Sequence, residues 1–495
     1  MPANLNLAHD ADPLRNDHLE VPSLRNADHM TAGTASLSYP SAMMTPAPDE
    51  IDAVDLPVTG ALPLELTGRY FRNGPNPLPG EPVRHLLIGS GMLHGVRLRR
   101  GRAEWYRNRW TRTARFAGRP FVRPDGTRDL TAVSANTHVI RHAGRILALV
   151  EVGFPYEVTP ELDTVGPCDF GGRLTTAMTA HPKCDPATGE LHFFGYGTQP
   201  PFVTYHRLDA AGQLVYSRPV AVTAGTMMHD FAITEHHVVW LDLPITFQRE
   251  LIGKAMPYRW DDQYGARLGV MRHDRPGAPV RWFDIDPCYV FHVGNAHEDA
   301  AGRIVLDAVR YSAAAFNAMW RMVSRTANPA AAAAVAGPGS ARLHRWWLAP
   351  VTGTVSEQPL DDRSVEFPTV ADHKVGRSSH CLYTVADTYA AGAAGIPGVA
   401  ILKYDTAGGG ATSYELDPGT AVGEAVFVPA SGGARREDDG WLICIATRRD
   451  GTASQLLILD ASNVTAGPIA AVDLPRGVPS GFHGSWIPDA DQPCL

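Results

Sequence analysis

Four short segments, each built around one histidine, decide how this chain must fold. They are Thr179-Ala180-His181-Pro182-Lys183, Met228-His229-Asp230-Phe231, Phe291-His292-Val293-Gly294-Asn295-Ala296 and Gly481-Phe482-His483-Gly484-Ser485-Trp486. Imidazole suits iron, copper, zinc and nickel, so the four segments suggest a metal site made of histidines alone. Ligands this far apart in sequence require a chain that returns repeatedly to one axis. The segments therefore predict a closed, radial β architecture.

Short apolar stretches between turn signals recur on both sides of these segments. Examples are residues 145–150, 237–241, 303–307, 399–404 and 441–446. Such stretches predict β-strands, and the 47 glycines and 40 prolines fit many tight turns between them. One helix is expected within residues 311–336, where alanines and large apolar residues alternate until Pro329 interrupts them.

Composition bounds the domain organisation. Residues 1–45 are rich in Asn, Asp, Ala, Ser and Pro without periodicity, which predicts a flexible leader. No change of composition divides residues 46–495, and closed β folds often run large as one unit. We therefore expect one domain after the leader.

Charge, hydropathy and cysteine spacing exclude several classes of protein. The net charge of −8 and the lack of a basic tract argue against nucleic-acid binding. No apolar run reaches the roughly 18 residues of a membrane span, and the N-terminus lacks a secretory pattern. The six cysteines are scattered without a CxxC pair, which predicts neither a thiolate zinc site nor a dense disulfide framework. A reduced, cytoplasmic protein is expected.

A histidine taken singly is explained most simply as a buried ring that bonds a backbone carbonyl, and this chain has 20 of them. The four segments in this order, however, resemble those of the carotenoid cleavage oxygenases. That family includes apocarotenoid, stilbene and lignostilbene oxygenases and the retinoid isomerase of the eye. The resemblance extends from about Leu62 to Trp486 and includes residues 68–77, 91–96, 106–109, 366–368, 423–429 and 437–440.

The resemblance implies both a fold and a site. The fold would be a seven-bladed β-propeller, with helical and loop insertions near residues 243–270 and 311–340 capping one face. The family's four iron ligands would correspond to His181, His229, His292 and His483. The glutamates that accept hydrogen bonds from ligand rings would correspond to Glu151, Glu366 and Glu424, since a carboxylate on one imidazole nitrogen orients the other toward a metal.

The implied activity is that of a non-haem dioxygenase with one Fe²⁺ per chain. Dioxygen, as co-substrate, is inserted across a carbon–carbon double bond to give two carbonyl products. Four neutral ligands leave one or two positions open on the metal, as dioxygen chemistry requires. No residue beyond the metal centre is expected to act as an acid or a base.

The chain departs from the family pattern in two places, and the second bears on the substrate. The stretch His85 to Met92 lacks the two aspartates that many members carry, which touches loop geometry and none of the expected ligands. Stilbene-cleaving members place a lysine before the first glutamate, whereas this chain has Val150. An apolar residue favours a carotenoid or apocarotenoid. Cleavage of a stilbene or phenylpropanoid of the lignostilbene or isoeugenol type remains the alternative, with His138 or Tyr156 binding the phenol.

The class of protein, the metal and the partners each admit a second interpretation. A non-catalytic propeller could serve as an interaction platform, and a redox-inactive metal in the same cage would support isomerase or hydrolase chemistry. The expected partner is a lipophilic small molecule, and the oligomeric state is left open. Peripheral membrane contact would involve an apolar patch on one face of the fold. The patch would comprise residues 243–247 and 251–260 with Phe316, Met319, Trp320 and Met322.

Overall fold

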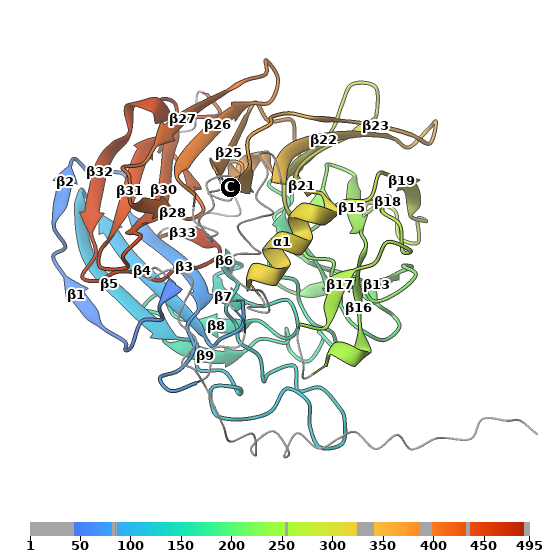
Figure 1. Ribbon diagram of the computed structural model, residues 1–495, viewed down its shortest axis with the longest axis horizontal. Coiled ribbons are helices and arrows are strands. Elements are labelled where there is room, and N and C mark those ends of the chain that lie inside the picture. Colours follow the sequence, from blue (N-terminus) through green and yellow to red (C-terminus); the bar gives the residue numbers. More distant parts are fainter. Residues whose placement is uncertain are drawn as a thin grey trace, which may run out of the picture.

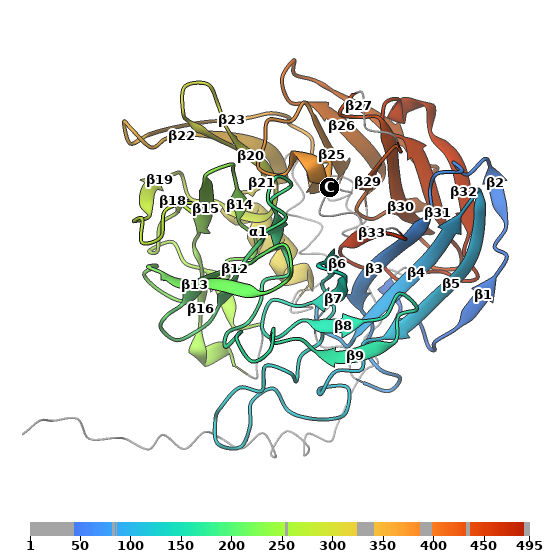
Figure 2. The same ribbon diagram turned by 180° about the vertical axis from the view of Figure 1, so that it is seen from behind.

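The computed structural model describes residues 44–81, 85, 87–252, 256–323, 341–386, 398–431 and 436–489. Within these residues seven sheets of four to six strands stand around a common axis as the blades of a propeller (Figures 1 and 2). A small hairpin forms an additional two-stranded sheet. The prediction of an all-β, seven-bladed propeller is confirmed.

The first three blades follow one another along residues 52–220 and include the last strand of the described chain. Blade 1 contains β1 (Asp52–Val54), β3 (Gly68–Pro75), β4 (Gly91–Arg99), β5 (Arg102–Trp110) and β33 (Gly484–Pro488). Blade 2 contains β6 (His138–His142), β7 (Arg145–Leu149), β8 (Tyr156–Val158) and β9 (Thr164–Pro167). Blade 3 contains β10 (Lys183–Cys184), β11 (Leu191–Tyr196), β12 (Val203–Leu208) and β13 (Leu214–Val220).

The remaining four blades complete the circle. Blade 4 contains β14 (Ala232–Ile233), β15 (His237–Asp242), β18 (Arg267–Arg272) and β19 (Arg281–Asp284). Blade 5 contains β20 (Tyr289–Glu298), β21 (Ile304–Tyr311), β22 (Ala341–Ala349) and β23 (Thr354–Pro359). Blade 6 contains β24 (Val365–Thr369), β25 (Cys381–Ala386), β26 (Ala400–Asp405) and β27 (Ala411–Glu415). Blade 7 contains β28 (Thr420–Val422), β29 (Val426–Pro429), β30 (Gly440–Arg448), β31 (Ser454–Asp460), β32 (Pro468–Asp473) and β2 (Val58–Gly60).

Strands from both ends of the described chain close the circle. The C-terminal β33 pairs with β3 at the axial edge of blade 1, with Tyr70 opposite Trp486. The N-terminal β2 pairs with β32 at the outer edge of blade 7, with Val58 opposite Val472. Closure matters for the site because it places the segment before β33 on the axis.

The core lies between neighbouring blades. Middle strands are covered on both faces, so every residue of β11 is buried, and so is all of β15 except His237. The outer strand β23 is packed on one side only and shows the exposed alternation expected there. This packing fixes each inner strand relative to the axis.

Two insertions cover one face of the propeller, and α1 is visible on this face in Figure 1. The hairpin of β16 (Ile245–Phe247) and β17 (Tyr258–Trp260) carries the 3-10 turn η3 (Arg249–Leu251), and α1 spans Ala313–Val323. Indole Nε1 of Trp320 donates to the carbonyl of Tyr258 at 3.0 Å, and this bond ties α1 to the hairpin. Two further 3-10 turns are η4 (Asp372–Lys374) and η6 (Val464–Ala466).

Several sequence predictions meet these described ranges only in part. The predicted leader lies almost wholly outside them, as do residues 324–340 of the second expected insertion. The expectation that the cysteines are reduced is wrong at Cys184, which is disulfide-bonded, although Cys168, Cys288, Cys381 and Cys444 are free. No helix in the described part of the chain is long and apolar enough to cross a membrane.

Candidate metal centre

Four imidazoles from four different blades meet on the propeller axis. One ring nitrogen each from His181, His229, His292 and His483 lies within 4.8 Å of the others. Nε2 of His229 is 3.0 Å from Nε2 of His181 and 3.4 Å from Nε2 of His292. The structure therefore brings together all four histidines that the sequence singled out.

Each histidine reaches the axis because an innermost strand begins or bends there. His181, His229 and His483 precede β10, β14 and β33 by a few residues at most, where the chain has not yet joined its ladder. His292 lies inside β20, whose register against β21 shifts between Val290 and Val293. Such a bulge redirects side chains out of the regular alternation, and here it points the imidazole at the axis.

Three glutamates from the remaining blades hold three of these rings. Nδ1 of His292 donates to Glu366 at 2.6 Å, and Nδ1 of His483 donates to Glu424 at 2.9 Å. Nδ1 of His229 donates to Glu151 in the same way. Because each carboxylate accepts a hydrogen bond from Nδ1–H, the Nε2 lone pair of each ring faces the axis.

The carboxylates are themselves held by further donors. The hydroxyl of Tyr311 donates to Glu366 at 2.6 Å, and the amide of Gly484 donates to Glu424 at 2.9 Å. Burial raises the pKa of Glu366, but its contacts with His292 and Tyr311 outweigh burial and leave that pKa below its usual value. Glu366 is therefore an ionised acceptor.

Backbone strain accompanies this arrangement at Glu366. The next residue, Phe367, has a φ of 52°, in the left-handed region that bulky side chains rarely adopt. Its amide donates to Glu366 at 2.6 Å, and its ring stacks on the imidazole of His292 with centroids 5.3 Å apart. The strained turn thus lets Glu366 accept a hydrogen bond from the His292 imidazole while Phe367 packs against the same imidazole.

The donor set fits a metal ion. His229 and His292 present unprotonated Nε2 atoms 3.4 Å apart, and two lone pairs at that separation cannot form a hydrogen bond. Ligand nitrogens about 2.1 Å from one ion and at right angles are about 3.0 Å apart, close to the distances seen here. A cation at the centre therefore explains a geometry that neutral imidazoles alone would resist.

His181 differs from the other three. None of the described carboxylates contacts its ring, while its backbone amide donates to Oγ1 of Thr179 at 3.1 Å. Burial lowers the pKa of its ring well below the usual value, so the ring is neutral and able to bind a metal. Three glutamates thus orient three of the histidines, and the fourth histidine, His181, is positioned through its backbone.

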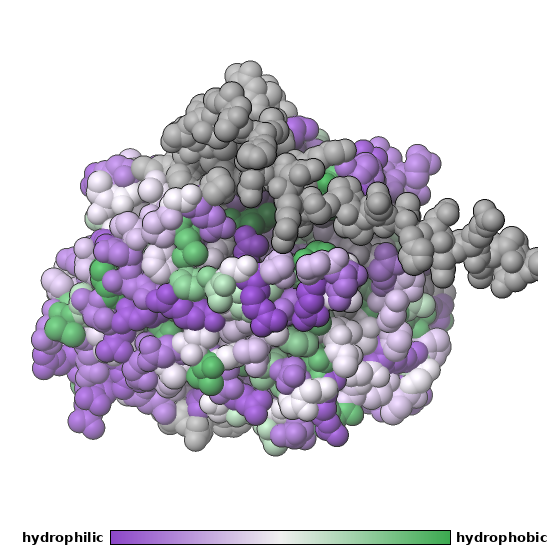
Figure 3. Space-filling view, turned by 90° about the horizontal axis from the view of Figure 1, so that it is seen from below, coloured by the Kyte–Doolittle hydropathy of each residue, from purple (hydrophilic) through white to green (hydrophobic). Residues whose placement is uncertain are grey.

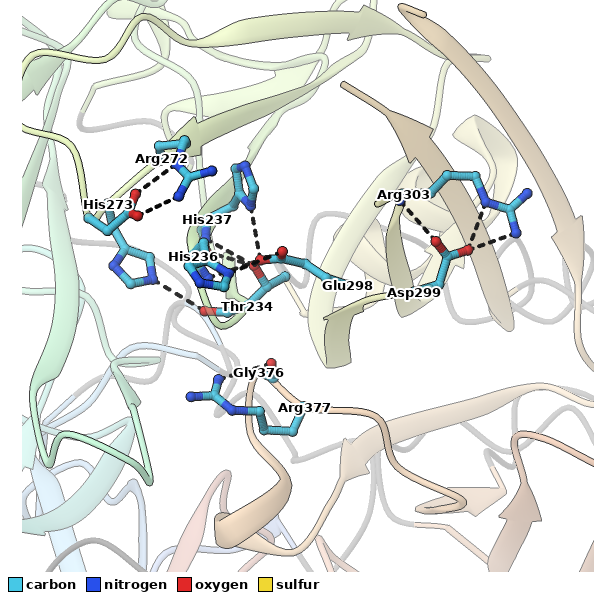
Figure 4. Close-up of polar contacts among 11 residues, drawn as sticks. Thr234, His236, His237, Arg272, His273, Glu298, Asp299, Arg303, Gly376 and Arg377 are labelled. Atoms are coloured by element: carbon cyan, nitrogen blue, oxygen red, sulfur yellow. Dashed lines mark hydrogen bonds and ion pairs between the residues drawn. The ribbon is translucent and has the colours of Figure 1, made fainter. Parts of the chain in front are cut away.

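A second cluster of histidines shows how ordinary imidazoles behave in this fold (Figure 4). His236 and His237 both direct Nδ1 at Glu298, at 3.2 and 3.0 Å, and Oγ1 of Thr234 donates to the same carboxylate at 2.7 Å. These rings share an acceptor and do not converge on a point. Within the described residues only the axial four form a ligand group.

An apolar cavity of about 390 Å³ lies against one side of the ring of four imidazoles. Its size falls within the range of about 300–1,000 Å³ typical of small-molecule sites. His229, His292 and His483 form part of its wall, so a bound apolar molecule would lie beside the candidate metal site. Apolar and aromatic side chains make most of the remaining wall, including Val133, Val150, Met227, Phe291, Met319, Trp320 and Phe482.

The two residues considered as phenol partners do not line this cavity. The hydroxyl of Tyr156 donates to the carbonyl of Thr131 at 2.7 Å, where it serves blade packing. Nδ1 of His138 bonds the carbonyl of Ala180 at 2.9 Å, and its ring lines a different cavity. That suggestion was wrong because a single sequence does not show which side of a blade a residue faces.

Sequence reasoning missed the tyrosines around the carboxylates. Tyr196 and Tyr311 contact Glu151 and Glu366, and Tyr258 lines the same apolar cavity. Tyr196 ends the strand β11, Tyr311 ends β21 and Tyr258 begins β17. No motif marked Tyr196 or Tyr311, and Tyr258 entered only as part of the apolar stretch 251–260. Their positions depend on how distant segments pack together.

Comparison with known proteins places this geometry among relatives. The family model described as retinal pigment epithelial membrane protein matches residues 44–488. A carotenoid cleavage oxygenase from Mycobacterium tuberculosis is 39% identical over 518 residues, covering 93% of this chain and all of that protein. Carotenoid 9,10(9′,10′)-cleavage dioxygenase 1 from Arabidopsis thaliana is 32% identical over 502 residues, covering 91% and 90%.

Solved structures agree with these sequence matches. An apocarotenoid oxygenase from Synechocystis, in a Glu-to-Gln variant, superposes with a TM-score of 0.77 at 28% identity. The match covers 90% of this chain and 98% of that one. A cobalt-substituted form of the Synechocystis protein gives a TM-score of 0.75 at 27% identity, with the same coverage.

Proposed function

The chain belongs to the carotenoid cleavage oxygenase family, and we propose that it cleaves one carbon–carbon double bond of a carotenoid or apocarotenoid. Dioxygen supplies one oxygen atom to each carbon of the broken bond, so the products are two carbonyl compounds. The observation that carries the proposal is the ring of four imidazoles opening on an apolar cavity.

The residues divide the work of holding the metal. His181, His229, His292 and His483 are proposed to bind one Fe²⁺ through nitrogen, as non-haem iron enzymes of this family do. Glu151, Glu366 and Glu424 keep three rings in the required tautomer and offset the charge of the cation in a buried site. When bound, the iron would activate dioxygen, which otherwise reacts slowly with a spin-paired alkene.

The cavity wall is proposed to place the double bond. Phe291 and Trp320 give the wall aromatic surface against which a rigid polyene can pack, and Val150 leaves the approach to Glu151 apolar. Their packing excludes water and holds the chain beside the histidines, so orientation contributes most of the rate that the protein itself controls. Among the described residues lining the cavity there is no lysine to pair with a phenol, which favours a polyene over a hydroxystilbene.

We propose a protein that works in the aqueous phase of the cytoplasm, with membrane contact limited to the rim of the capping insertions. Within the described part of residues 243–260, Ile252 is a large apolar side chain that is 58% exposed. On the side seen in Figure 3, hydrophobic residues lie singly or in small groups among hydrophilic ones. Cosedimentation with phosphatidylcholine vesicles tests this directly, and Ile252→Ser should abolish any binding that occurs through the rim.

In the decisive experiment the protein is first reconstituted anaerobically with Fe²⁺. It is then given an apocarotenal or, in a separate reaction, a hydroxystilbene, both in air. We expect two carbonyl fragments from the apocarotenal by mass spectrometry, in proportion to bound iron. His292→Ala should abolish cleavage, whereas His236→Ala, a matched change in the outer histidine cluster, should not. Cleavage of the hydroxystilbene alone would overturn the substrate, and protein that takes up no iron would favour an interaction platform.

A further inference from the structure

The apolar cavity contains few polar side-chain atoms, and most are already satisfied. The hydroxyls of Tyr196 and Tyr311 donate to Glu151 and Glu366. Nδ2 of Asn136 donates to two backbone carbonyls, those of residues 87 and 89, at 3.1 Å each. Its Oδ1 accepts from Thr137 at 3.2 Å. These groups hold the walls and have nothing left to offer a ligand.

Tyr258 is different. It stands at the start of β17 and lines the cavity, with its ring edge-on to Phe247 at 5.7 Å and to Tyr196 at 6.5 Å between centroids. Its carbonyl accepts from Trp320 at 3.0 Å, which fixes the backbone of the hairpin against α1. Its phenolic hydroxyl has no hydrogen-bond partner among the described residues, and its side chain is half-buried in the cavity wall.

The hydroxyl is suited to donate a hydrogen bond. Burial, with Glu151 adding to its effect, raises the pKa of Tyr258 far above the usual value for a phenol, so the proton is retained at every physiological pH. When a bound apolar chain excludes water from this wall, a donor left without an acceptor costs free energy. An acceptor carried by the ligand would remove that cost.

We propose that Tyr258 donates a hydrogen bond to an oxygen atom of the substrate. The ligand chemistry is an aldehyde, ketone or alcohol oxygen on an otherwise apolar chain, which selects an oxygenated apocarotenoid over a hydrocarbon carotene. This inference rests on the proposed function and narrows its substrate class. The bond fixes how far the chain slides past the histidines and therefore which double bond is cut.

Of two other polar side chains on the wall, Arg115 fits this role less well and Ser134 is a second hydroxyl that must be tested. Arg115 directs Nη2 at Glu81, 3.3 Å away, and is more than one-third exposed, so its charge is already paired and solvated. Ser134 precedes β6 of blade 2, whereas Tyr258 belongs to the capping hairpin inserted in blade 4. Ser134 therefore provides a control hydroxyl at another part of the same wall.

The kinetic test compares Tyr258→Phe and Ser134→Ala with wild type on two polyenes of equal length, one ending in an aldehyde and one a hydrocarbon. For Tyr258→Phe we expect kcat/KM to fall about tenfold with the aldehyde, the value of one net hydrogen bond, and less than about twofold with the hydrocarbon. Ser134→Ala should leave the ratio of the two kcat/KM values unchanged, because Ser134 is not expected to bond the aldehyde oxygen. A third arm with a 4-hydroxystilbene separates a phenol oxygen from an apocarotenoid oxygen.

The binding test needs no turnover. Iron-free protein is mixed with the aldehyde polyene, quenching of tryptophan fluorescence gives the affinity, and Raman spectroscopy gives the carbonyl stretch. We expect a lowered carbonyl frequency in wild type and in Ser134→Ala, and its return to the solution value in Tyr258→Phe.

Tyr258 lacks the proposed role if Tyr258→Phe alters neither selectivity nor the carbonyl frequency, if Ser134→Ala alters them instead, or if only the hydroxystilbene responds. Failure of wild-type protein to cleave any polyene is a different result, since it rejects the proposed function while the binding test still reports on Tyr258.

Discussion

Two cavities lie on opposite sides of the ring of four imidazoles. Their walls share His292 and His483 and have no other described residue in common. The cavity of about 390 Å³ is lined in part by the insertions and is apolar. The other, of about 790 Å³, follows the inner strands and carries charged side chains such as Lys183, Asp230 and Asp372. The candidate metal site thus separates an apolar compartment from a polar one.

The difference shows how one fold can keep an apolar cavity suited to a hydrocarbon chain apart from a cavity lined by charged side chains. In the polar cavity Lys183 pairs with the buried Asp230 at 2.8 Å, and such groups hold water. In the apolar cavity the hydroxyls that contact carboxylates are turned toward the glutamates, which keeps the wall available to a hydrocarbon chain. The ring of histidines therefore borders an apolar cavity on one side and a polar cavity on the other.

The largest expected effect comes from a residue that belongs to both walls. His292→Ala should lower activity by at least about 1,000-fold, because a three-histidine ring with an orphaned Glu366 holds Fe²⁺ poorly. Iron per chain, measured by mass spectrometry after anaerobic loading, should fall in parallel. Retention of a full iron complement together with normal cleavage would show that the shared wall is not the metal site.

A weaker effect should follow when His292 is kept and only the carboxylate that bonds its imidazole is changed. Glu366→Gln keeps an acceptor for His292 but removes its charge, so iron affinity should fall about 10–100-fold. Glu357→Gln is the matched control, because Glu357 pairs with His344 at 3.1 Å on an outer strand. Competition with a chelator measures both affinities, and equal losses in the two variants would contradict a role special to the axis.

The contrast between the two walls can be tested with one side-chain type. Met319→Gln places an amide in the apolar cavity, where it lacks partners, and should lower kcat/KM for a polyene about tenfold. Ala211→Gln places the same amide in the polar cavity and should change kcat/KM less than about twofold. Melting temperatures of both variants control for folding. Equal kinetic effects would mean that the polyene does not distinguish the compartments.

The smallest expected effect concerns the polar cavity alone. The protein surrounding Asp372 restricts its hydration and raises its pKa from 3.8 to about 6, so the folded protein binds this proton more tightly than the unfolded chain. Stability from Asp372 is therefore present below pH 4 and lost as pH rises to about 6. Because Asp372 is exposed, solvent screening limits the effect to about 1 kcal/mol.

Asp372→Asn should accordingly be more stable than wild type by about that amount above pH 6 and equal to it below pH 4. Urea unfolding at intervals of one pH unit across this window gives the comparison, with cleavage activity unchanged. A difference that grows toward low pH would have the wrong sign for a carboxyl whose pKa is raised.

Much of the site followed from sequence because its residues sit in short motifs. The short motifs around the four histidines are visible in a single sequence. Because His181, His229, His292 and His483 are far apart in sequence, only a fold that returns repeatedly to one axis could bring them together. The glutamates were reached through resemblance, and the contact of Glu366 with His292 depends on a bulge and a strained Phe367 that no local pattern indicates.

What escaped prediction depends on pairing between distant segments. The closure of β33 on β3 and of β2 on β32 joins chain ends that share no local signal. Tyr258 reaches the cavity because the β16–β17 hairpin is tied to α1, and Tyr156 leaves it because a blade turns it toward Thr131. Which side of a strand faces a cavity is set by register between strands, and a single sequence does not specify that register.

The most direct test is anomalous diffraction at the iron absorption edge, from crystals loaded anaerobically with Fe²⁺ and an apocarotenal. We predict one peak among the Nε2 atoms of the four axial histidines, with polyene density in the cavity that Val150, Phe291 and Trp320 line. A peak elsewhere, or a polyene lying in the polar cavity beside Lys183 and Asp372, would contradict the proposed site.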